Sequence, residues 1–164
     1  MSLITDLTRI YLTHSTKPFI FTNDFDKVLP YDEDSEFGLY VHIPFCKSIC
    51  NFCPYCKIIY DEETAKGYID ALIKEIHLVG KQWNGRRKAT SLYFGGGTPA
   101  LLADRITDII SALREHFIIM DGIGIELHPD NVNISVLKTL KSAGVDKISI
   151  GIQSFQDKYR RVLQ

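Results

Sequence analysis

The sequence predicts an α/β fold built from parallel β-α-β units, and two observations support this prediction. Short runs with strand character alternate with longer runs of helical spacing, in the order β-α-β-α-β-α-β, which is typical of parallel units with right-handed crossovers. The polar and glycine-rich segments fall where the predicted strands end, and parallel folds bind ligands at those carboxyl ends. The 164 residues, of which 45% are hydrophobic and 24% charged, suffice for one domain with a core.

The composition limits the possible partners and the compartment. A net charge of −1 gives no bulk attraction to nucleic acid or to a membrane surface. Residues 1–10 lack the basic start and apolar core of a signal peptide, and no apolar run approaches the roughly 20 residues that span a bilayer. Four cysteines without an export signal predict a reducing cytoplasm, in which thiols bind metal instead of forming disulfides.

The predicted domain begins after an amino-terminal lead-in. Residues 3–14 place apolar side chains at helical spacing, which predicts a short amphipathic helix. Residues 18–38 are mixed and acidic, and we expect no regular structure there. We therefore divide the chain into a lead-in, residues 1–38, and a core, residues 39–164.

The first β-α unit of this core starts at residue 39. Residues 39–45 are apolar and rich in β-formers, which predicts a buried first strand. A cysteine-rich loop follows its carboxyl end. Residues 61–83 then form a long run with one apolar face and acidic residues at its start, which predicts a helix.

The second unit contains a glycine turn. Residues 89–94 predict the second strand, and they run directly into Gly-Gly-Gly-Thr-Pro. Thr98 can cap a following helix that has Pro99 in its first position. The apolar spacing predicts that this helix continues to Phe117.

The third unit completes the predicted sheet. Residues 122–127 predict the third strand, and residues 133–143 predict a helix closed by Gly144 as its C-terminal cap. Residues 147–152 predict the fourth strand. Residues 156–164 have the pattern of the opening of a fourth helix.

The cysteines are gathered in the loop after the first strand. Cys46, Cys50 and Cys53 have the spacing C-x3-C-x2-C, and Cys56 follows two residues later. Clustered thiolates select zinc or iron–sulfur centres. Structural zinc sites usually join two distant knuckles, whereas this chain has one loop, which suits three corners of a cubane cluster. A zinc-binding module without redox chemistry is the alternative.

This segment resembles a known family. The run Y-x-H-I-P-F before C-x3-C-x2-C is similar to radical S-adenosylmethionine enzymes and, more narrowly, to the oxygen-independent coproporphyrinogen III oxidase group, which includes haem chaperones. The resemblance implies a [4Fe–4S] cluster held by Cys46, Cys50 and Cys53. It also implies S-adenosylmethionine on the fourth iron, cleaved reductively to a 5′-deoxyadenosyl radical. A porphyrinogen or haem would be the small-molecule substrate, and flavodoxin or ferredoxin the electron donor.

The resemblance also implies residues that contact S-adenosylmethionine. The glycine turn is similar to the family's G-G-G-T-P motif, whose backbone meets the methionyl end. Glu126 and Gln153 match the family's glutamate and its G-V-Q-S-F glutamine, and Tyr40 and Phe52 match aromatic positions near the cofactor. Read without the resemblance, these residues are a plain turn, polar strand ends and core aromatics. The implied cofactor-binding residues are Tyr40, Phe52, Gly95, Gly96, Gly97, Thr98, Glu126 and Gln153.

Some residues depart from the family pattern or receive no role. The oxidases carry a fourth cysteine one residue beyond the triad, whereas Cys56 follows after two, so we assign it no ligand role. His128 replaces the usual asparagine. His42 is predicted to be a packed core histidine. The remaining histidines are predicted to lie on helix surfaces: His14, His77 and His116.

The resemblance covers roughly residues 39–160 and implies part of a (β/α)6 partial TIM-type barrel. Four of the six strands are predicted here, which leaves the fourth strand as an exposed edge and the core incomplete at its carboxyl end. We therefore do not expect this chain alone to turn over a porphyrinogen. A haem-binding chaperone remains the alternative within the family.

Overall fold

The computed structural model describes residues 7–8, 11 and 36–162. The chain divides into two units, residues 1–31 and residues 32–164. In the first unit, Leu7, Thr8 and Tyr11 are helical and exposed. The rest of the helix predicted over residues 3–14, and the lead-in before residue 36, lie outside the described residues.

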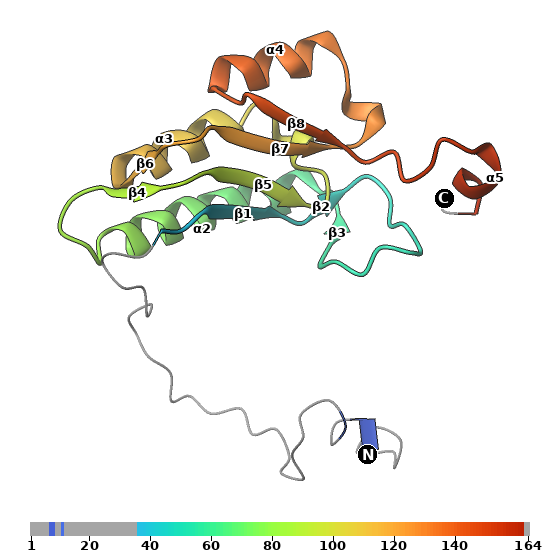
Figure 1. Ribbon diagram of the computed structural model, residues 1–164, viewed down its shortest axis with the longest axis horizontal. Coiled ribbons are helices and arrows are strands. Elements are labelled where there is room, and N and C mark those ends of the chain that lie inside the picture. The colour runs from blue at the N-terminus through green and yellow to red at the C-terminus, as the bar shows by residue number, and fades with distance from the viewer. Residues whose placement is uncertain (1–6, 9–10, 12–35, 163–164) are drawn as a thin grey trace. The chain divides into compact units, whose positions relative to one another are not determined.

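The second unit is built on a parallel four-stranded sheet (Figure 1). The strand order is β1-β5-β7-β8, and each neighbouring pair is parallel. This confirms the predicted class of fold. The strands are β1 (Leu39–Ile43), β5 (Leu92–Gly96), β7 (Ile123–Leu127) and β8 (Lys147–Ile150).

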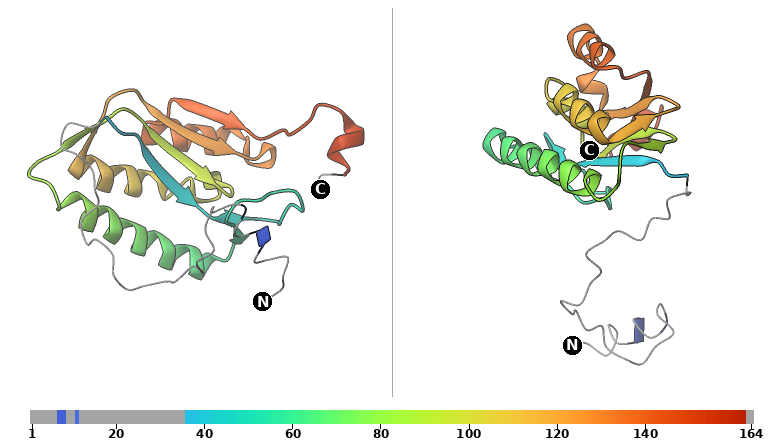
Figure 2. Two further views of the ribbon diagram at one scale, coloured as in Figure 1. Left: turned by 60° about the horizontal axis from the view of Figure 1, so that its bottom comes forward. Right: turned by 90° about the vertical axis from the view of Figure 1, so that its left-hand side faces the viewer.

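Three helices cover one face of this sheet (Figure 2). They are α2 (Glu62–Gly80), α3 (Ile106–His116) and α4 (Ile134–Ala143), and a short α5 (Asp157–Arg160) follows β8. Each of the first three links two neighbouring strands of the sheet, as parallel β-α-β units require. No helix in the described part of the chain is long and apolar enough to cross a membrane.

The helix ends follow their local sequence. Asp61 is the N-cap of α2, and its carboxylate accepts from the Thr64 amide at 2.8 Å. Asn133 caps α4 in the same way. Gly144 closes α4 at φ 99, as predicted, because glycine adopts this left-handed conformation without steric cost.

The predicted helix over residues 99–117 is wrong in its extent. Pro99–Leu102 forms a 3-10 turn, η1, and α3 begins only at Ile106. The side chain of Thr98 makes no capping hydrogen bond. Phe117 starts a strand, β6 (Phe117–Ile119), that pairs with β4 (Arg87–Ala89). The apolar residues of β6 continue the helical spacing of α3, so periodicity alone did not reveal the change.

Three further short elements were not predicted. β2 (Phe45–Cys46) pairs with β3 (Ile58–Ile59) and closes the base of the cysteine loop. Pro129–Asn131 forms a second 3-10 turn, η2, after β7. Elements of two or three residues carry too little periodicity to be recognised from sequence.

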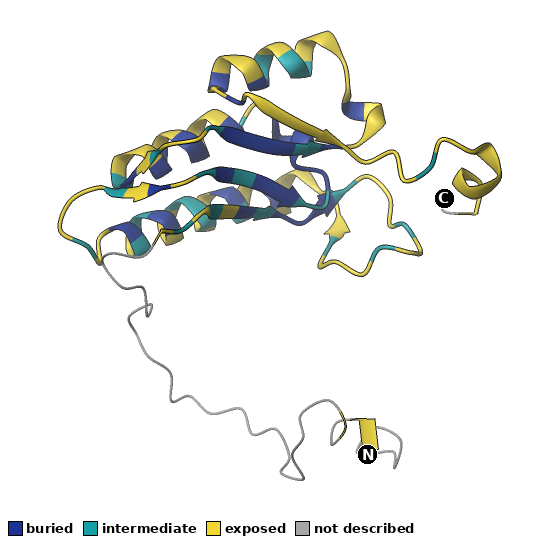
Figure 3. Ribbon diagram, in the orientation of Figure 1, coloured by how far each residue is buried: buried dark blue, intermediate teal, exposed yellow. Residues whose placement is uncertain are grey.

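The core lies between the sheet and the helices (Figure 3). Alternate residues of β1, β5 and β7 face this core, and Ile43, Phe94 and Ile125 are fully buried there. The intervening residues face the other side, which no described helix covers. By strand register that side carries Tyr40 beside Tyr93 and Tyr93 beside Gly124.

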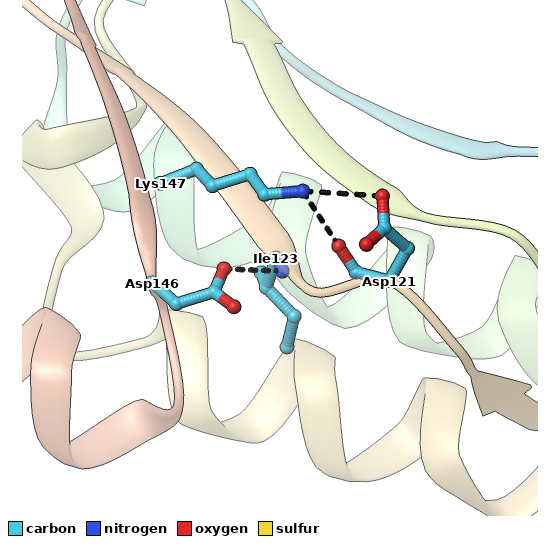
Figure 4. Close-up of polar contacts among 4 residues, drawn as sticks. All are labelled: Asp121, Ile123, Asp146 and Lys147. Carbon is cyan, nitrogen blue, oxygen red and sulfur yellow. Dashed lines mark hydrogen bonds and ion pairs between the residues drawn. The ribbon is translucent and has the colours of Figure 1, made fainter.

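Polar contacts fix the amino ends of β7 and β8 (Figure 4). The Lys147 ammonium donates to the Asp121 carbonyl at 2.7 Å and approaches its carboxylate at 3.3 Å. Asp146 accepts from the Ile123 amide at 2.8 Å. Gly122 has φ +94, and a Cβ there would lie 2.4 Å from an Asp146 carboxylate oxygen. These contacts hold the register at the end of the sheet opposite the cysteines.

The edge strand β8 is exposed along its whole length. Ile148 and Ile150 are 45% and 44% exposed. Within the described residues β8 has one neighbour, β7, which confirms the expectation of an exposed fourth strand.

Candidate functional site

A cleft of about 430 Å³ opens where the strands end. The cysteine loop, the glycine loop and the ends of β7 and β8 form its walls. All predicted site residues line it except Tyr40 and Gly95. Those in the wall are Cys46, Cys50, Phe52, Cys53, Gly96, Gly97, Thr98, Glu126 and Gln153.

The backbone closes the cysteine loop at its base. The Ile58 amide donates to the Pro44 carbonyl and the Tyr60 amide to the Cys46 carbonyl, both at 2.8 Å. Within the loop the Cys53 amide donates to the Cys50 carbonyl at 3.3 Å. The fourth thiol, Cys56, is exposed and lies outside the cleft wall. The three spaced cysteines therefore face one cleft, and the fourth does not.

The glycine loop is bound directly to the start of the cysteine loop. The Gly97 amide donates to the Ile43 carbonyl at 2.8 Å, and the Thr98 amide donates to the Phe45 carbonyl at 2.7 Å. A Cβ at Gly97 would lie 2.6 Å from the Phe45 carbonyl oxygen and 2.8 Å from Cys46 Sγ. The protein itself therefore needs a bare backbone here, independently of any ligand.

The thiol of Cys46 has a hydrogen-bond partner, Thr98, on the glycine loop. The Thr98 hydroxyl lies 3.9 Å from Cys46 Sγ and can donate to it. Burial raises the pKa of the Cys46 thiol, and this hydrogen bond opposes the rise. Cys53 and Cys50 raise that pKa further through their charges. A bound metal ion would stabilise the thiolate against both effects.

His42 is not the packed core histidine that the sequence suggested. It lies half-buried on the uncovered face of the sheet, and its Nε2 is 2.9 Å from the Cys56 carbonyl. Because a carbonyl only accepts, Nε2 donates, and Nδ1 of a neutral ring can then accept from the Tyr40 hydroxyl at 3.2 Å. His42 thus links β1 to the cysteine loop.

Tyr40 lies beside the cleft without entering its wall, and its side chain is 59% exposed. Its ring covers Gly95, where a Cβ would lie 2.9 Å from Tyr40 Cε2. Burial raises the pKa of Tyr40, and the charge of Glu126 raises it further. Tyr40 and Gly95 therefore pack against each other on the sheet face next to the cleft.

Glu126 and Gln153 bring polar groups to the far wall. Glu126 on β7 lines the cleft, and the Tyr93 hydroxyl donates to its carboxylate at 3.3 Å. Gln153 has φ 63, a left-handed conformation that is uncommon for a residue other than glycine. Gln153 follows the end of β8 and lines the cleft together with Ile150 and Gly151.

Several polar residues of the cleft were not predicted as site residues. Lys57 donates to the Cys53 carbonyl, and His128 Nδ1 accepts from the Asp130 amide at 3.3 Å. Asn131 is buried in η2. Lys57, His128 and Asn131 lie in loops or short turns, which give no periodic signal. The unpredicted polar residues of the wall are Lys47, Ser48, Lys57, His128, Asp130, Asn131 and Ser149.

Comparison with known proteins places this geometry in a family. The family model described as the Radical SAM superfamily matches residues 40–164. The oxygen-independent coproporphyrinogen III oxidase of Pseudomonas aeruginosa is 33% identical over 132 residues, 77% of this chain and 29% of that protein. The heme chaperone HemW of Bacillus subtilis is 32% identical over 123 residues, 72% of this chain and 32% of that protein.

A solved structure supports the same relationship. The coproporphyrinogen III oxidase HemN of Escherichia coli, described as a radical SAM enzyme, superposes with a TM-score of 0.72 at 34% identity. The superposition covers 80% of this chain and 31% of that one. The parallel sheet and its helices thus correspond to part of the TIM-type barrel of that fold. The chain spans about a third of the length of these relatives, and it belongs to the radical SAM superfamily.

Proposed function

We propose that residues 39–164 form a radical S-adenosylmethionine core that holds a [4Fe–4S] cluster and S-adenosylmethionine. Cys46, Cys50 and Cys53 would hold the cluster. The single observation that carries the proposal is that these three thiols share one cleft with the glycine loop and Glu126, in a chain of this family. Residues 1–38 would be a lead-in to that core.

The donor set fits a cluster better than a single zinc ion. At about 2.3 Å per Zn–S bond, two thiolates on one tetrahedral zinc lie roughly 3.8 Å apart. Among the described residues, the close group of possible ligands to a single ion is His77, Glu115 and His116, and it contains no cysteine. The three cysteines line one cleft without forming such a close group, and a cubane takes each thiolate on a different iron.

The chain's own residues position and shield these groups. When bound, the cluster and S-adenosylmethionine would supply reductive cleavage of the sulfonium and a 5′-deoxyadenosyl radical able to abstract hydrogen. Glu126, oriented by Tyr93, offers a carboxylate to hydroxyl or ammonium groups in the cleft. His42 would hold the cysteine loop in place, because its Nε2 donates a hydrogen bond to the Cys56 carbonyl. Phe52 adds an apolar ring to the wall of the same cleft.

The substrate class we propose is a porphyrinogen. The 5′-deoxyadenosyl radical would take a hydrogen atom from a propionate, and the resulting substrate radical would release CO2 and pass its remaining electron to a one-electron acceptor, which leaves a vinyl group. Support comes from relatives in Pseudomonas aeruginosa and Escherichia coli whose names state coproporphyrinogen III oxidase. The electron would come from a small redox protein such as flavodoxin or ferredoxin. The cleft and these names give no support to a nucleic-acid partner.

Haem binding is the second candidate function. The relative named heme chaperone in Bacillus subtilis is 32% identical, against 33% for the oxidase. Haem titration followed by absorbance, set against anaerobic turnover of coproporphyrinogen, separates the two. Saturable haem binding supports the chaperone, and turnover supports the oxidase.

Anaerobic reconstitution tests the cofactor proposal. The chain is loaded with iron and sulfide, reduced, and examined by EPR with and without S-adenosylmethionine. The proposal predicts a reduced [4Fe–4S] signal that changes when S-adenosylmethionine is added. A colourless protein that retains zinc, or a cluster signal indifferent to S-adenosylmethionine, would contradict it.

A further inference from the structure

A second group of possible metal ligands lies far from the cysteine cleft. It joins the last turns of α2 and α3, at the opposite end of the sheet (Figure 1). His77 of α2 faces Glu115 and His116 of α3, and their ligand atoms all lie within 4.8 Å of one another. The two histidines were predicted to be surface residues, but both are half-buried and turned toward each other.

We propose that His77, Glu115 and His116 bind one divalent transition-metal ion of the zinc class. Two imidazoles and one carboxylate are a ligand set that zinc accepts, with a fourth position left to water. This site goes beyond the proposed cofactor function, because no cysteine and no residue of the cleft takes part in it.

The distances require only a small adjustment. His77 Nδ1 lies 2.9 Å from His116 Nε2. With Zn–N bonds of about 2.1 Å, two nitrogens on a tetrahedral zinc lie roughly 3.4 Å apart, so the rings need to separate by about 0.5 Å. Glu115 Oε2 is 3.8 Å from His77 Nδ1, and its side chain is 65% exposed and free to rotate inward.

The protonation states also permit binding. Without metal, one ring donates to the other across the 2.9 Å contact, so one of the two facing nitrogens carries a proton. With metal, both facing nitrogens must present lone pairs, and each neutral ring keeps its proton on the remote nitrogen. Binding therefore needs a change of tautomer in one ring. Neither of the two neutral imidazoles has to lose its proton.

Packing holds one ligand in place. The His116 ring lies directly on Gly80, where a Cβ would be 2.1 Å from His116 Cγ. The ring also packs edge-on against His77, with ring centroids 5.2 Å apart. His77 keeps 31% of its side chain exposed, which gives an ion access from solvent.

The helix ends favour a cation at this point. His77 lies in the last turn of α2, and His116 is the last residue of α3. The carboxyl end of a helix carries partial negative charge, which stabilises positive charge nearby. An ion bound here would also link α2 to α3 and so stabilise the folded chain.

The test is a Co²⁺ titration followed by visible absorption, with Zn²⁺ competition. It uses the full chain in which all four cysteines are changed to serine, so that thiols do not compete. We expect one Co²⁺ per chain, with d–d bands and no thiolate charge-transfer band. His77→Gln and His116→Gln should each weaken binding by about tenfold or more, since even outer partners of a ligand are worth 10–100-fold.

His128→Gln is the control, because His128 has a carboxylate, Asp130, at 3.5 Å but belongs to no group of three possible metal ligands among the described residues. It should leave Co²⁺ affinity unchanged. Equal affinity in the parent, His77→Gln and His116→Gln, or no binding at all, overturns the proposal. If the cysteine-free chain does not unfold cooperatively, zinc stoichiometry in the parent decides: His77→Gln must hold one zinc fewer, and equal stoichiometry overturns the proposal.

Discussion

Glu126 is a carboxylate of the cleft wall, and the Tyr93 hydroxyl donates to it at 3.3 Å. Glu126→Gln keeps the size of the side chain and removes its charge. A hydrogen bond to a charged group contributes about 1.5–3 kcal/mol, so we expect S-adenosylmethionine to bind about tenfold or more weakly, measured by equilibrium dialysis of the reconstituted chain. Iron content should not change. Tyr93→Phe, which keeps the charge, should have a smaller effect, and an unaltered affinity in Glu126→Gln would exclude the carboxylate from the binding site.

The backbone of Gly97 lies so close to Phe45 and Cys46 that a side chain at this position would clash with them. Because a Cβ would lie 2.6 Å from the Phe45 carbonyl oxygen and 2.8 Å from Cys46 Sγ, we expect Gly97→Ala to destabilise the chain by about 1–3 kcal/mol and to reduce the iron retained. Chemical denaturation and iron analysis measure the two effects.

Gly67 provides the control for that substitution. It lies inside α2, and a Cβ there would meet nothing within 4 Å. Gly67→Ala should therefore stabilise the chain by about 1 kcal/mol through helix propensity. Equal behaviour of the two variants would show that the glycine loop is an ordinary turn.

At the scale of elements, the N-cap of α2 makes stability depend on pH. The Thr64 hydroxyl and amide donate to the Asp61 carboxylate at 2.6 and 2.8 Å, and these hydrogen bonds lower the pKa of Asp61. A lowered folded-state pKa means that the contribution is complete above the unfolded pKa of about 3.9 and is lost as pH falls through the lower folded value.

We therefore expect Asp61→Ala to lower the melting temperature at pH 7, and the difference from the parent to shrink below about pH 4. Asp61→Asn keeps an oxygen acceptor, so its melting temperature at pH 7 should lie between those of Asp61→Ala and the parent. Thermal melts from pH 2 to 7 measure this. A difference that does not change with pH would mean that the carboxylate charge is not what caps the helix.

The elements also show where sequence reasoning succeeds and where it stops. Strand and helix alternation predicted β1, β5, β7, β8 and the helices between them, because each is long enough to show its period. Phe117 was assigned to α3 because its spacing continues that helix, yet it pairs with β4 in β6. The pairing depends on residues about 30 positions away, which local periodicity does not contain.

The candidate site was predicted to a similar degree. The positions of the cysteines, the glycine loop and Glu126 at strand ends were enough to gather them at one cleft. Thr98 was expected to cap a helix, but its hydroxyl faces Cys46. His42 was predicted as a core residue, and His77 and His116 as surface residues. Their hydrogen-bond partners come from segments distant in sequence, which the local pattern does not reveal.

At the scale of the whole molecule, β8 offers an exposed apolar edge. Exposed strand edges invite pairing with another chain, and Ile148 is 45% exposed on β8. We expect this chain to self-associate with rising concentration, and Ile148→Lys to reduce the association in sedimentation velocity. Leu78→Lys is the control, since Leu78 is 70% exposed on α2, away from this edge. Equal association of both variants and the parent would show that β8 is not the contact.

Three thiols of one loop, and not the fourth, are expected to hold an iron–sulfur cluster. The most direct test of this expectation is iron and sulfide content after anaerobic reconstitution of four single variants. Cys46→Ser, Cys50→Ser and Cys53→Ser should each lose the cluster, because each thiol lines the cleft. Cys56→Ser should keep it, because that thiol is exposed outside the cleft wall. Loss of iron in Cys56→Ser, or full retention in any of the other three, would contradict the account.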